Sequence, residues 1–205
     1  MTVKAAVVGC GQWGRNHVRT LAGIGALAAI SDNDPDRAAA LSAEHGVPAL
    51  PLDDILQRHD IQAVVLALPP RLHAEIGQKI LAAGKDVLIE KPIALAPADA
   101  QASVALARDR GRVLMVGHIL RFHPVFEEMV RQVEAGRIGT LKHIVATRLG
   151  LGRFLGMDAV WDLAPHDLSL VIALAGTYDV DMQTLRQTVL SLSLIHISEP
   201  TRQEA

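Results

Sequence analysis

The chain has 205 residues, of which 50% are hydrophobic and only 3% aromatic, and its formal net charge is −2 at pH 7. This length fits one large domain or one and a half, and the core must consist mainly of aliphatic side chains, as in buried parallel sheets. The charge provides no basic field, which argues against a nucleic-acid partner, and the single cysteine excludes an internal disulfide framework.

No segment has the pattern of a targeting sequence or a membrane span. Glycines and Arg15 interrupt the first apolar stretch, unlike the apolar region of a signal peptide. The longest late apolar run, residues 168–175, is too short to cross a bilayer. Together with the lone Cys10, which fits a reducing compartment, these features predict a cytoplasmic protein with no membrane partner.

The first predicted strand, residues 3–9, leads into a glycine-rich turn. Gly9, Gly11 and Gly14 have the G-x-G-x-x-G spacing, and a helix-compatible stretch, residues 15–21, follows at once. At this spacing the first glycine permits a tight turn, the second removes a side chain where a pyrophosphate approaches, and the third lets helix and strand pack closely. The helix N-terminus then offers N–H groups to the phosphates. The pattern predicts a dinucleotide site, with a glycine turn that binds no ligand as the alternative.

The second predicted strand, residues 26–31, ends at an acidic residue. Asp32 lies about 20 residues after the glycine turn, where a ribose-binding acid is found in dinucleotide-binding folds. Its carboxylate accepts hydrogen bonds from both ribose hydroxyls and repels a 2′-phosphate, so we expect NAD as the cofactor. Arg37 is near enough in sequence to supply a countercharge, which leaves NADP as the less favoured cofactor. Cys10 is interpreted as a small filler of the turn, with a reactive thiol as the alternative.

Strands and helices then alternate along the chain. Further buried strands are predicted at residues 63–67, 86–90 and 113–117, and helices at residues 35–45, 73–83 and 98–110. Gly46, Gly84 and Gly111 follow these helices, where left-handed C-terminal caps are expected. Alternation of this kind predicts right-handed crossovers and a doubly wound parallel α/β sheet.

The pattern changes after residue 117. A helix is predicted at residues 124–135, a strand at 141–149, a polar stretch at 150–158, and a helix that starts at Pro165 and ends at Ala175. One strand and two helices do not complete a domain. We therefore predict a Rossmann domain over residues 1–120 and the truncated start of an α+β substrate domain over residues 121–191.

The last residues have a separate interpretation. Residues 189–197 alternate apolar and polar side chains, which by pattern alone predicts a strand. However, residues 192–202 resemble a translated transposase adapter used in preparing sequencing libraries. We interpret residues 192–205 as a non-native tail on a truncated chain, with a genuine edge strand as the alternative.

Chemistry-bearing motifs follow three of the predicted strands, at the edge where open parallel sheets bind ligands. The motifs are Leu68-Pro69-Pro70, Glu90-Lys91-Pro92 and Gly117-His118. Together with Gly9-Cys-Gly-Gln-Trp-Gly14, His73 and Asp162-Leu-Ala-Pro-His166, they run in one order over residues 3–176. In these motifs the chain resembles the glucose–fructose oxidoreductase/inositol dehydrogenase (Gfo/Idh/MocA) family of NAD(P)-dependent sugar and polyol dehydrogenases.

The resemblance implies two groups of site residues. The expected cofactor site consists of Gly9, Gly11, Gln12, Trp13, Gly14, Asp32, Pro69, His73 and Glu90. The expected catalytic group consists of Lys91, Asp162 and His166. The resemblance also implies a small-molecule sugar or nucleotide-sugar substrate and a homo-oligomeric full-length protein.

Acid–base chemistry suggests a role for each catalytic residue. Removal of hydride from a CH–OH carbon requires a base, and a histidine, with an ordinary pKa of ~6.5, suits neutral conditions. We predict His166 as the base, Lys91 as the cation that stabilises the alkoxide and relays the proton, and Asp162 as the orienting group. The alternatives are a solvated surface lysine, an aspartate that caps a helix, and a packed or capping histidine.

The substrate prediction rests on the later motifs. Residues 147–154 and 160–167 resemble family members that oxidise the sugar 3-position of a UDP-N-acetylhexosamine or its uronate. Arg148 and Arg153 are predicted to meet a diphosphate or carboxylate, with ordinary solvated arginines as the alternative. His118 and Arg121 are secondary candidates for the pocket. The histidines lack zinc-ligand spacing and no cysteine joins them, so no metal is expected.

Two other interpretations of the function stay open. One is a regulatory or sensor protein that binds the cofactor without turnover, and the other is a dehydrogenase of inositol or a free sugar. Retention of all three catalytic candidates favours an enzyme. The truncated chain itself is expected to be inactive.

Overall fold

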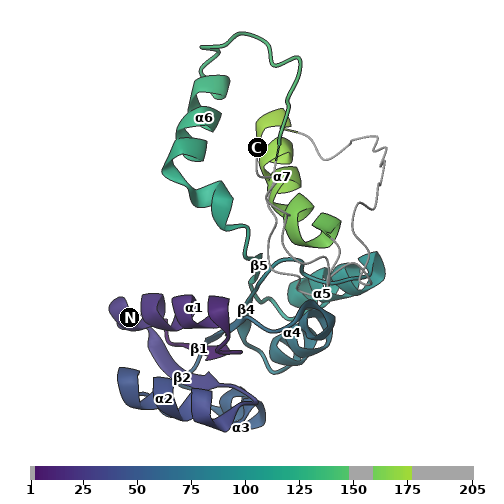
Figure 1. Ribbon diagram of the computed structural model, residues 1–205. Coiled ribbons are helices and arrows are strands. Elements are labelled where there is room, and N and C mark those ends of the chain that lie inside the picture. The colour runs from purple at the N-terminus through teal and green to yellow at the C-terminus, as the bar shows by residue number, and fades with distance from the viewer. Residues whose placement is uncertain (1–2, 148–158, 177–205) are drawn as a thin grey trace, which may run out of the picture.

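The computed structural model describes residues 3–147 and 159–176 (Figure 1). Its centre is a five-stranded sheet in the order β2-β1-β3-β4-β5. The strands are β1 (Ala5–Val8), β2 (Leu27–Ser31), β3 (Ala63–Leu66), β4 (Asp86–Ile89) and β5 (Leu114–Val116). Every neighbouring pair is parallel, which confirms the predicted parallel α/β sheet.

Helices connect successive strands, as the alternating pattern predicts. They are α1 (Gln12–Gly23), α2 (Pro35–His45), α3 (Leu52–Gln57), the 3-10 turn η1 (Pro70–Leu72), α4 (His73–Ala82) and α5 (Pro97–Asp109). The side chain of Asp34 accepts a hydrogen bond from the amide of Arg37 and so caps α2. The predicted glycine cap after this helix is confirmed, since Gly46 has a φ of 65°. The short helix α3 is not predicted by the sequence pattern, because its six residues give too few turns to show a periodicity.

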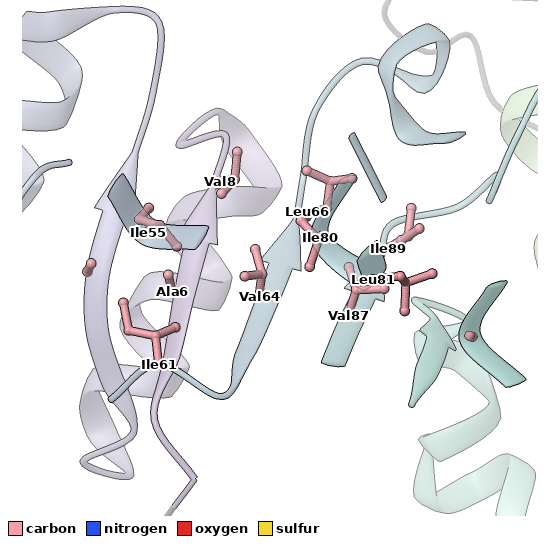
Figure 2. Close-up of a cluster of buried hydrophobic side chains, with 12 residues drawn as sticks. Ala6, Val8, Ile55, Ile61, Val64, Leu66, Ile80, Leu81, Val87 and Ile89 are labelled. Atoms are coloured by element: carbon pink, nitrogen blue, oxygen red, sulfur yellow. The ribbon is translucent and has the colours of Figure 1, made fainter. Parts of the chain in front are cut away.

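Strands β1 to β4 are largely buried on both faces because they carry small and branched aliphatic side chains. The predicted burial of the strand at residues 113–117 is wrong, because β5 lies at the edge of the sheet and its Met115 is 38% exposed. Alternate residues of β1, β3 and β4 point to one face, where they pack against α3, α4 and α5. Figure 2 shows this cluster, with labels on Ala6, Val8, Ile55, Ile61, Val64, Leu66, Ile80, Leu81, Val87 and Ile89. On the opposite face Val7 of β1 packs in a second cluster with Val18 of α1. These two layers hold the carboxyl ends of the strands rigidly at one edge.

The segment after β5 extends away from the sheet (Figure 1). It contains the 3-10 turn η2 (Ile119–Phe122), α6 (Pro124–Glu134) and α7 (Ala159–Ala175). The strand predicted at residues 141–149 is not found over its described part, residues 141–147. A strand must pair its backbone N–H and C=O groups, and the described residues beside this segment provide no partner strand. The predicted polar stretch 150–158, the strand 189–197 and the tail 192–205 lie outside the described residues.

Helix α7 starts earlier than the sequence predicts. Proline is common at the first helical position, which led to the predicted start at Pro165, but this residue lies inside the helix. Its ring has no N–H, so the carbonyl of Trp161 loses its usual donor within the helix. Asp162 therefore belongs to the helix instead of preceding it.

Across the described ranges, 3–147 and 159–176, we find no helix whose length and apolar character would allow it to cross a membrane.

Candidate active site

A cleft of about 490 Å³ lies at the carboxyl ends of the strands. Its walls are the loops after β1, β2, β3 and β4, joined by Asp162 of α7. Strand β1 is flanked by β2 on one side and β3 on the other, so the cleft sits where the strand order reverses. This position is where open α/β sheets bind ligands. Of the predicted cofactor residues, the cleft is lined by Gly9, Gly11, Gln12, Trp13, Asp32, Pro69 and Glu90.

The three glycines of the turn meet three different steric demands. Gly9 has a φ of 89°, and a Cβ there would stand 2.5 Å from the carbonyl oxygen of Ala67. A Cβ on Gly14 would stand 1.8 Å from the carbonyl oxygen of Gly9. Around Gly11, by contrast, no described atom beyond its immediate chain neighbours lies within 4 Å of the Cβ position. The turn therefore leaves open space in front of the first amides of α1, where a pyrophosphate fits.

This difference gives a matched test of the turn. Gly14→Ala should destabilise the fold by about 2 kcal/mol or more, because a methyl group cannot share space with a backbone carbonyl. Gly11→Ala should leave the urea midpoint nearly unchanged but weaken NAD binding, because its methyl group projects into the open space. Urea denaturation and NAD titration of both variants measure this. Equal losses of stability in the two variants would contradict the steric account.

A second hollow, of about 660 Å³, adjoins the cleft and shares five lining residues with it: Gly9, Asp32, Asn33, Leu68 and Leu72. Its other walls are largely apolar side chains from α2, the segment before α3, and α4. A flat aromatic base suits a hollow of this character, with its ribose beside Asp32.

Asp32 is held in one orientation by three donors. Its carboxylate accepts hydrogen bonds from the amides of Cys10 (2.5 Å) and Asp34 (2.8 Å), and from the guanidinium of Arg37 at 3.2 Å. Burial acts to raise the pKa of Asp32, but these hydrogen bonds and the Arg37 charge outweigh it and hold the pKa below its ordinary value. The side chain is only 7% exposed, yet it lines the cleft as an ionised acceptor.

Cys10 is fully buried within the turn, and its thiol lies 3.7 Å from the carbonyl oxygen of Ser31. Burial, reinforced by the charge of Asp32, raises the pKa of this thiol to about 11. Because the thiolate is the reactive form, we expect no alkylation by iodoacetamide in the native protein and full alkylation in denaturant. Mass spectrometry measures both states. Rapid native labelling at neutral pH would instead support the reactive-thiol interpretation.

Lys91 and Asp162 meet at the end of the cleft farthest along the sheet from Asp32. The Lys91 Nζ donates to both the Oδ1 atom and the backbone carbonyl of Asp162, each at 2.8 Å. The lysine side chain is 13% exposed, so it is not the solvated surface lysine of the alternative interpretation. The peptide bond between Lys91 and Pro92 is cis. The structure thus joins two predicted catalytic residues that are 71 positions apart.

His166 follows Asp162 by four residues on α7. Residues four apart lie one above the other on the same helix face, so His166 and Asp162 share a side of α7. Asp162 and His166 share a helix face only because α7 begins before Asp162. The predicted start at Pro165 leaves Asp162 outside the helix and therefore does not reveal this arrangement. A helix face that carries an acid and a histidine next to a lysine has the groups that acid–base chemistry requires.

His73, which the sequence predicts as a residue of the cofactor site, does not line the cleft. Its side chain is 1% exposed, and its two ring nitrogens lie 2.7 Å from the carbonyl oxygens of Leu68 and Pro92. His73 therefore ties the loop after β3 to the loop after β4, and so fixes the two walls of the cleft. Gly14 likewise lies behind the lining and acts through the packing of α1.

His17 is a site residue that the sequence analysis missed. Its Nε2 atom lies 2.7 Å from the Oε1 atom of Glu90, across 73 residues of sequence. His17 is three residues after Gly14, so it faces the same side of α1 as the glycine turn. Its spacing from Gly14 is a sequence feature that could have indicated His17 as a site residue. No feature of the neighbouring sequence indicates that Glu90 is its partner.

Of the four predicted substrate residues, the structure describes His118 and Arg121. His118 is half-buried at the end of β5, and burial, together with the charge of Arg121, lowers its pKa below the ordinary value against the opposing charge of Glu90. Arg121 is exposed in η2. Arg148 and Arg153 lie outside the described residues. Within the part of the chain that the structure describes, no three His, Cys, Asp or Glu side chains gather as a metal site would require.

Comparisons with known proteins agree with this architecture. Residues 3–118 match the model of an oxidoreductase family with an NAD-binding Rossmann fold, Gfo/Idh/MocA. UDP-N-acetylglucosamine 3-dehydrogenase of Acidithiobacillus ferrooxidans is 33% identical over 89% of this chain and 58% of its own. Its solved structure superposes with a TM-score of 0.73 at 31% identity, over 88% of this chain and 57% of that chain.

Two further proteins extend the comparison. Inositol 2-dehydrogenase 1 of Saccharopolyspora erythraea is 40% identical over 68% of this chain and 43% of its own. The structure of GenD2 from gentamicin A biosynthesis, in complex with NAD, has a TM-score of 0.75 at 26% identity, over 85% of this chain and 54% of that chain. The chain thus spans about half the length of the curated relatives it matches.

The fold and the cleft define a dinucleotide-binding α/β protein of the Rossmann type. Within that class, the chain belongs to the Gfo/Idh/MocA oxidoreductase family.

Proposed function

We propose that the chain forms the cofactor-binding part of an NAD-dependent dehydrogenase that oxidises a CH–OH group of a sugar or polyol. The observation that carries this proposal is the position of Lys91. Its ammonium, paired with Asp162, lies at one end of a cleft whose other end carries Asp32. A cation that binds an alcohol oxygen therefore shares one cleft with residues that fit a dinucleotide.

The glycine turn and Asp32 fit NAD. The open space at Gly11 and the first amides of α1 suit its pyrophosphate, and the ionised carboxylate of Asp32 suits two ribose hydroxyls. NADP is the less favoured cofactor. Arg37 offers it a countercharge, but this guanidinium is already paired with Asp32 and Asp34.

Oxidation of the alcohol carbon requires that a hydride and a proton leave. NAD, when bound, takes up the hydride. Lys91 stabilises the negative charge that develops on the substrate oxygen. Its ammonium has three N–H groups, of which Asp162 accepts two, so the third can donate to the substrate. His166 accepts the hydroxyl proton, directly or through Lys91, and Asp162 orients the lysine.

A UDP-N-acetylhexosamine or its uronate is the leading substrate. Similarity to a UDP-N-acetylglucosamine 3-dehydrogenase over 89% of the chain supports this choice. In this proposal Arg148 and Arg153 meet the diphosphate or carboxylate, and His118 and Arg121 line the pocket. Inositol or a free sugar is the alternative substrate, supported by the 40% identity to an inositol 2-dehydrogenase.

The domain organisation is also part of the proposal. The family match over residues 3–118 supports a cofactor domain at residues 1–120. Residues 121–191 would begin an α+β substrate domain, and residues 192–205 would be a non-native tail. We also propose that the intact protein is homo-oligomeric and cytoplasmic. Apolar side chains on and before α6, such as Phe122 and Val125, are exposed, which supports a further part of the protein packing over this segment.

The test is NADH formation by the intact enzyme with UDP-N-acetylglucosamine, its uronate, myo-inositol and free hexoses as separate substrates. We expect turnover with a UDP-sugar and little with the others. Turnover with myo-inositol alone would replace the leading substrate by the alternative. NAD binding without turnover of any substrate would support the sensor interpretation and contradict the enzyme.

A further inference from the structure

The carboxylate of Glu90 lies at the wall of the cleft, where His17 and Gly117 fix its position. Its side chain is 10% exposed, and His17 of α1 donates to it at 2.7 Å. A Cβ on Gly117, at the end of β5, would stand 3.1 Å from the carboxyl carbon, so this carboxylate lies directly over a glycine. Glu90 also lines the cleft next to Lys91. Helix α1 and the end of β5, which are far apart in sequence, thus fix the position of the Glu90 carboxylate beside the cleft.

The strand order determines which part of a dinucleotide reaches this charge. Asp32 follows β2 and Glu90 follows β4, three strand positions apart. At the usual spacing between strands this is about 14 Å, which an extended dinucleotide spans. Asp32 takes the adenosine ribose, and Lys91 takes the substrate oxygen. The nicotinamide ring must lie near Lys91 to receive a hydride, which places it at the Glu90 end.

The charges around this end do not cancel that of Glu90. The ammonium of Lys91 is already matched by the carboxylate of Asp162. His17 meets the Glu90 carboxylate through a hydrogen bond at its Nε2 atom. Burial and the charge of Arg121 lower the pKa of His118 below its ordinary value, against the opposing charge of Glu90. Arg71, which also lines the cleft, and Arg121 are both exposed, so solvent screens their charges. Among the described residues at this end, Glu90 is therefore a carboxylate that lines the cleft without a lysine or arginine paired to it.

Oxidised nicotinamide carries a positive charge on its ring, and the reduced ring carries none. We propose that Glu90, positioned by His17, makes the cleft bind NAD⁺ in preference to NADH. Glu90 acts as a specificity-determining residue for the redox state of the cofactor, and His17 acts as its positioning residue. This inference rests on the proposed function, because it needs a nicotinamide ring at the Lys91 end.

The experiment compares the Kd values of the 205-residue chain for NAD⁺ and NADH. Glu90→Gln keeps the shape of the side chain and its ability to accept from His17, but removes the charge. We expect this variant to lose on the order of tenfold in affinity for NAD⁺ and to keep its affinity for NADH. A matched control is Glu44→Gln on α2, because Glu44 also neighbours a histidine, His45 at 3.6 Å, but is exposed and away from the cleft.

Variants of His17 separate positioning from general stability. His17→Leu removes the hydrogen-bond donor to Glu90, so the Kd values for NAD⁺ and NADH should become more alike. His17→Gln keeps a donor at this position, so its ratio of Kd values should match that of the unmutated chain. A loss of affinity for both nucleotides alike in Glu90→Gln, or an unchanged ratio of Kd values, would overturn the role of the charge while leaving the proposed function standing. Failure of the unmutated chain to bind either nucleotide would overturn both.

Discussion

Replacing Lys91 by alanine in the intact enzyme should lower turnover by on the order of 10²-fold or more, the usual scale for groups that stabilise or move a proton. The reason is the location of its ammonium, 2.8 Å from the Asp162 carboxylate at the substrate end of the cleft. His166→Ala should have a loss of similar size, because the variant has no base for the hydroxyl proton. The affinity for NAD should change little, since neither residue belongs to the glycine turn or the ribose site.

Steady-state turnover and NAD titration, run side by side, measure this split. Lys79→Ala is a suitable control, because Lys79 is an exposed lysine on α4 with only a loose ionic partner, Asp53 at 3.7 Å. Its turnover should match that of the unmutated enzyme. Near-normal turnover in both the Lys91 and the His166 variants would remove the proposed catalytic assignment.

Replacing Asp32 by alanine should weaken NAD binding far more than NADP binding, and so narrow or reverse the cofactor preference. Two effects act in the same direction. The variant loses the acceptor for the ribose hydroxyls. It also removes one of the two carboxylates that pair with the guanidinium of Arg37, at 3.2 Å, so that this guanidinium can meet a 2′-phosphate while it keeps its pair with Asp34. Titration of both cofactors into the variant and the unmutated chain measures the change.

The double variant Asp32→Ala/Arg37→Ala tests the second effect. It should lose whatever affinity for NADP the single variant gains, because no guanidinium remains at the site. If the unmutated chain binds NADP more tightly than NAD, our interpretation of Asp32 is wrong. If the double variant keeps the gain, Arg37 has no part in it.

The sequence predicts those parts of the site that depend on the turn or strand in which a residue lies. Gly9 and Gly14 must be glycines because a Cβ would collide with backbone, either five residues away in the turn or just after the adjacent strand β3, and this steric demand shows in their spacing. Asp32 follows from the end of the second strand. The parallel sheet follows from buried aliphatic runs alternating with capped helices.

The parts that the sequence does not predict depend on distant partners. The pairing of His17 with Glu90 joins residues 73 positions apart, and the burial of His73 depends on two loop carbonyls. The sequence pattern does not predict the start of α7, because a proline is typical of the first helical position, whereas Pro165 lies inside this helix. The strand predicted from residue 141 onward had the right composition but no partner among the described residues.

The most direct test of a cofactor cleft at this edge of the sheet uses Trp13, which lines it. The chain has two tryptophans, so the Trp161→Phe variant leaves Trp13 as the sole fluorophore of its kind. We expect NADH to quench its fluorescence in a saturable manner through energy transfer, and NAD⁺ to reverse the quenching by competition. Unchanged Trp13 fluorescence with excess NADH, in a chain shown to be folded, would contradict the account.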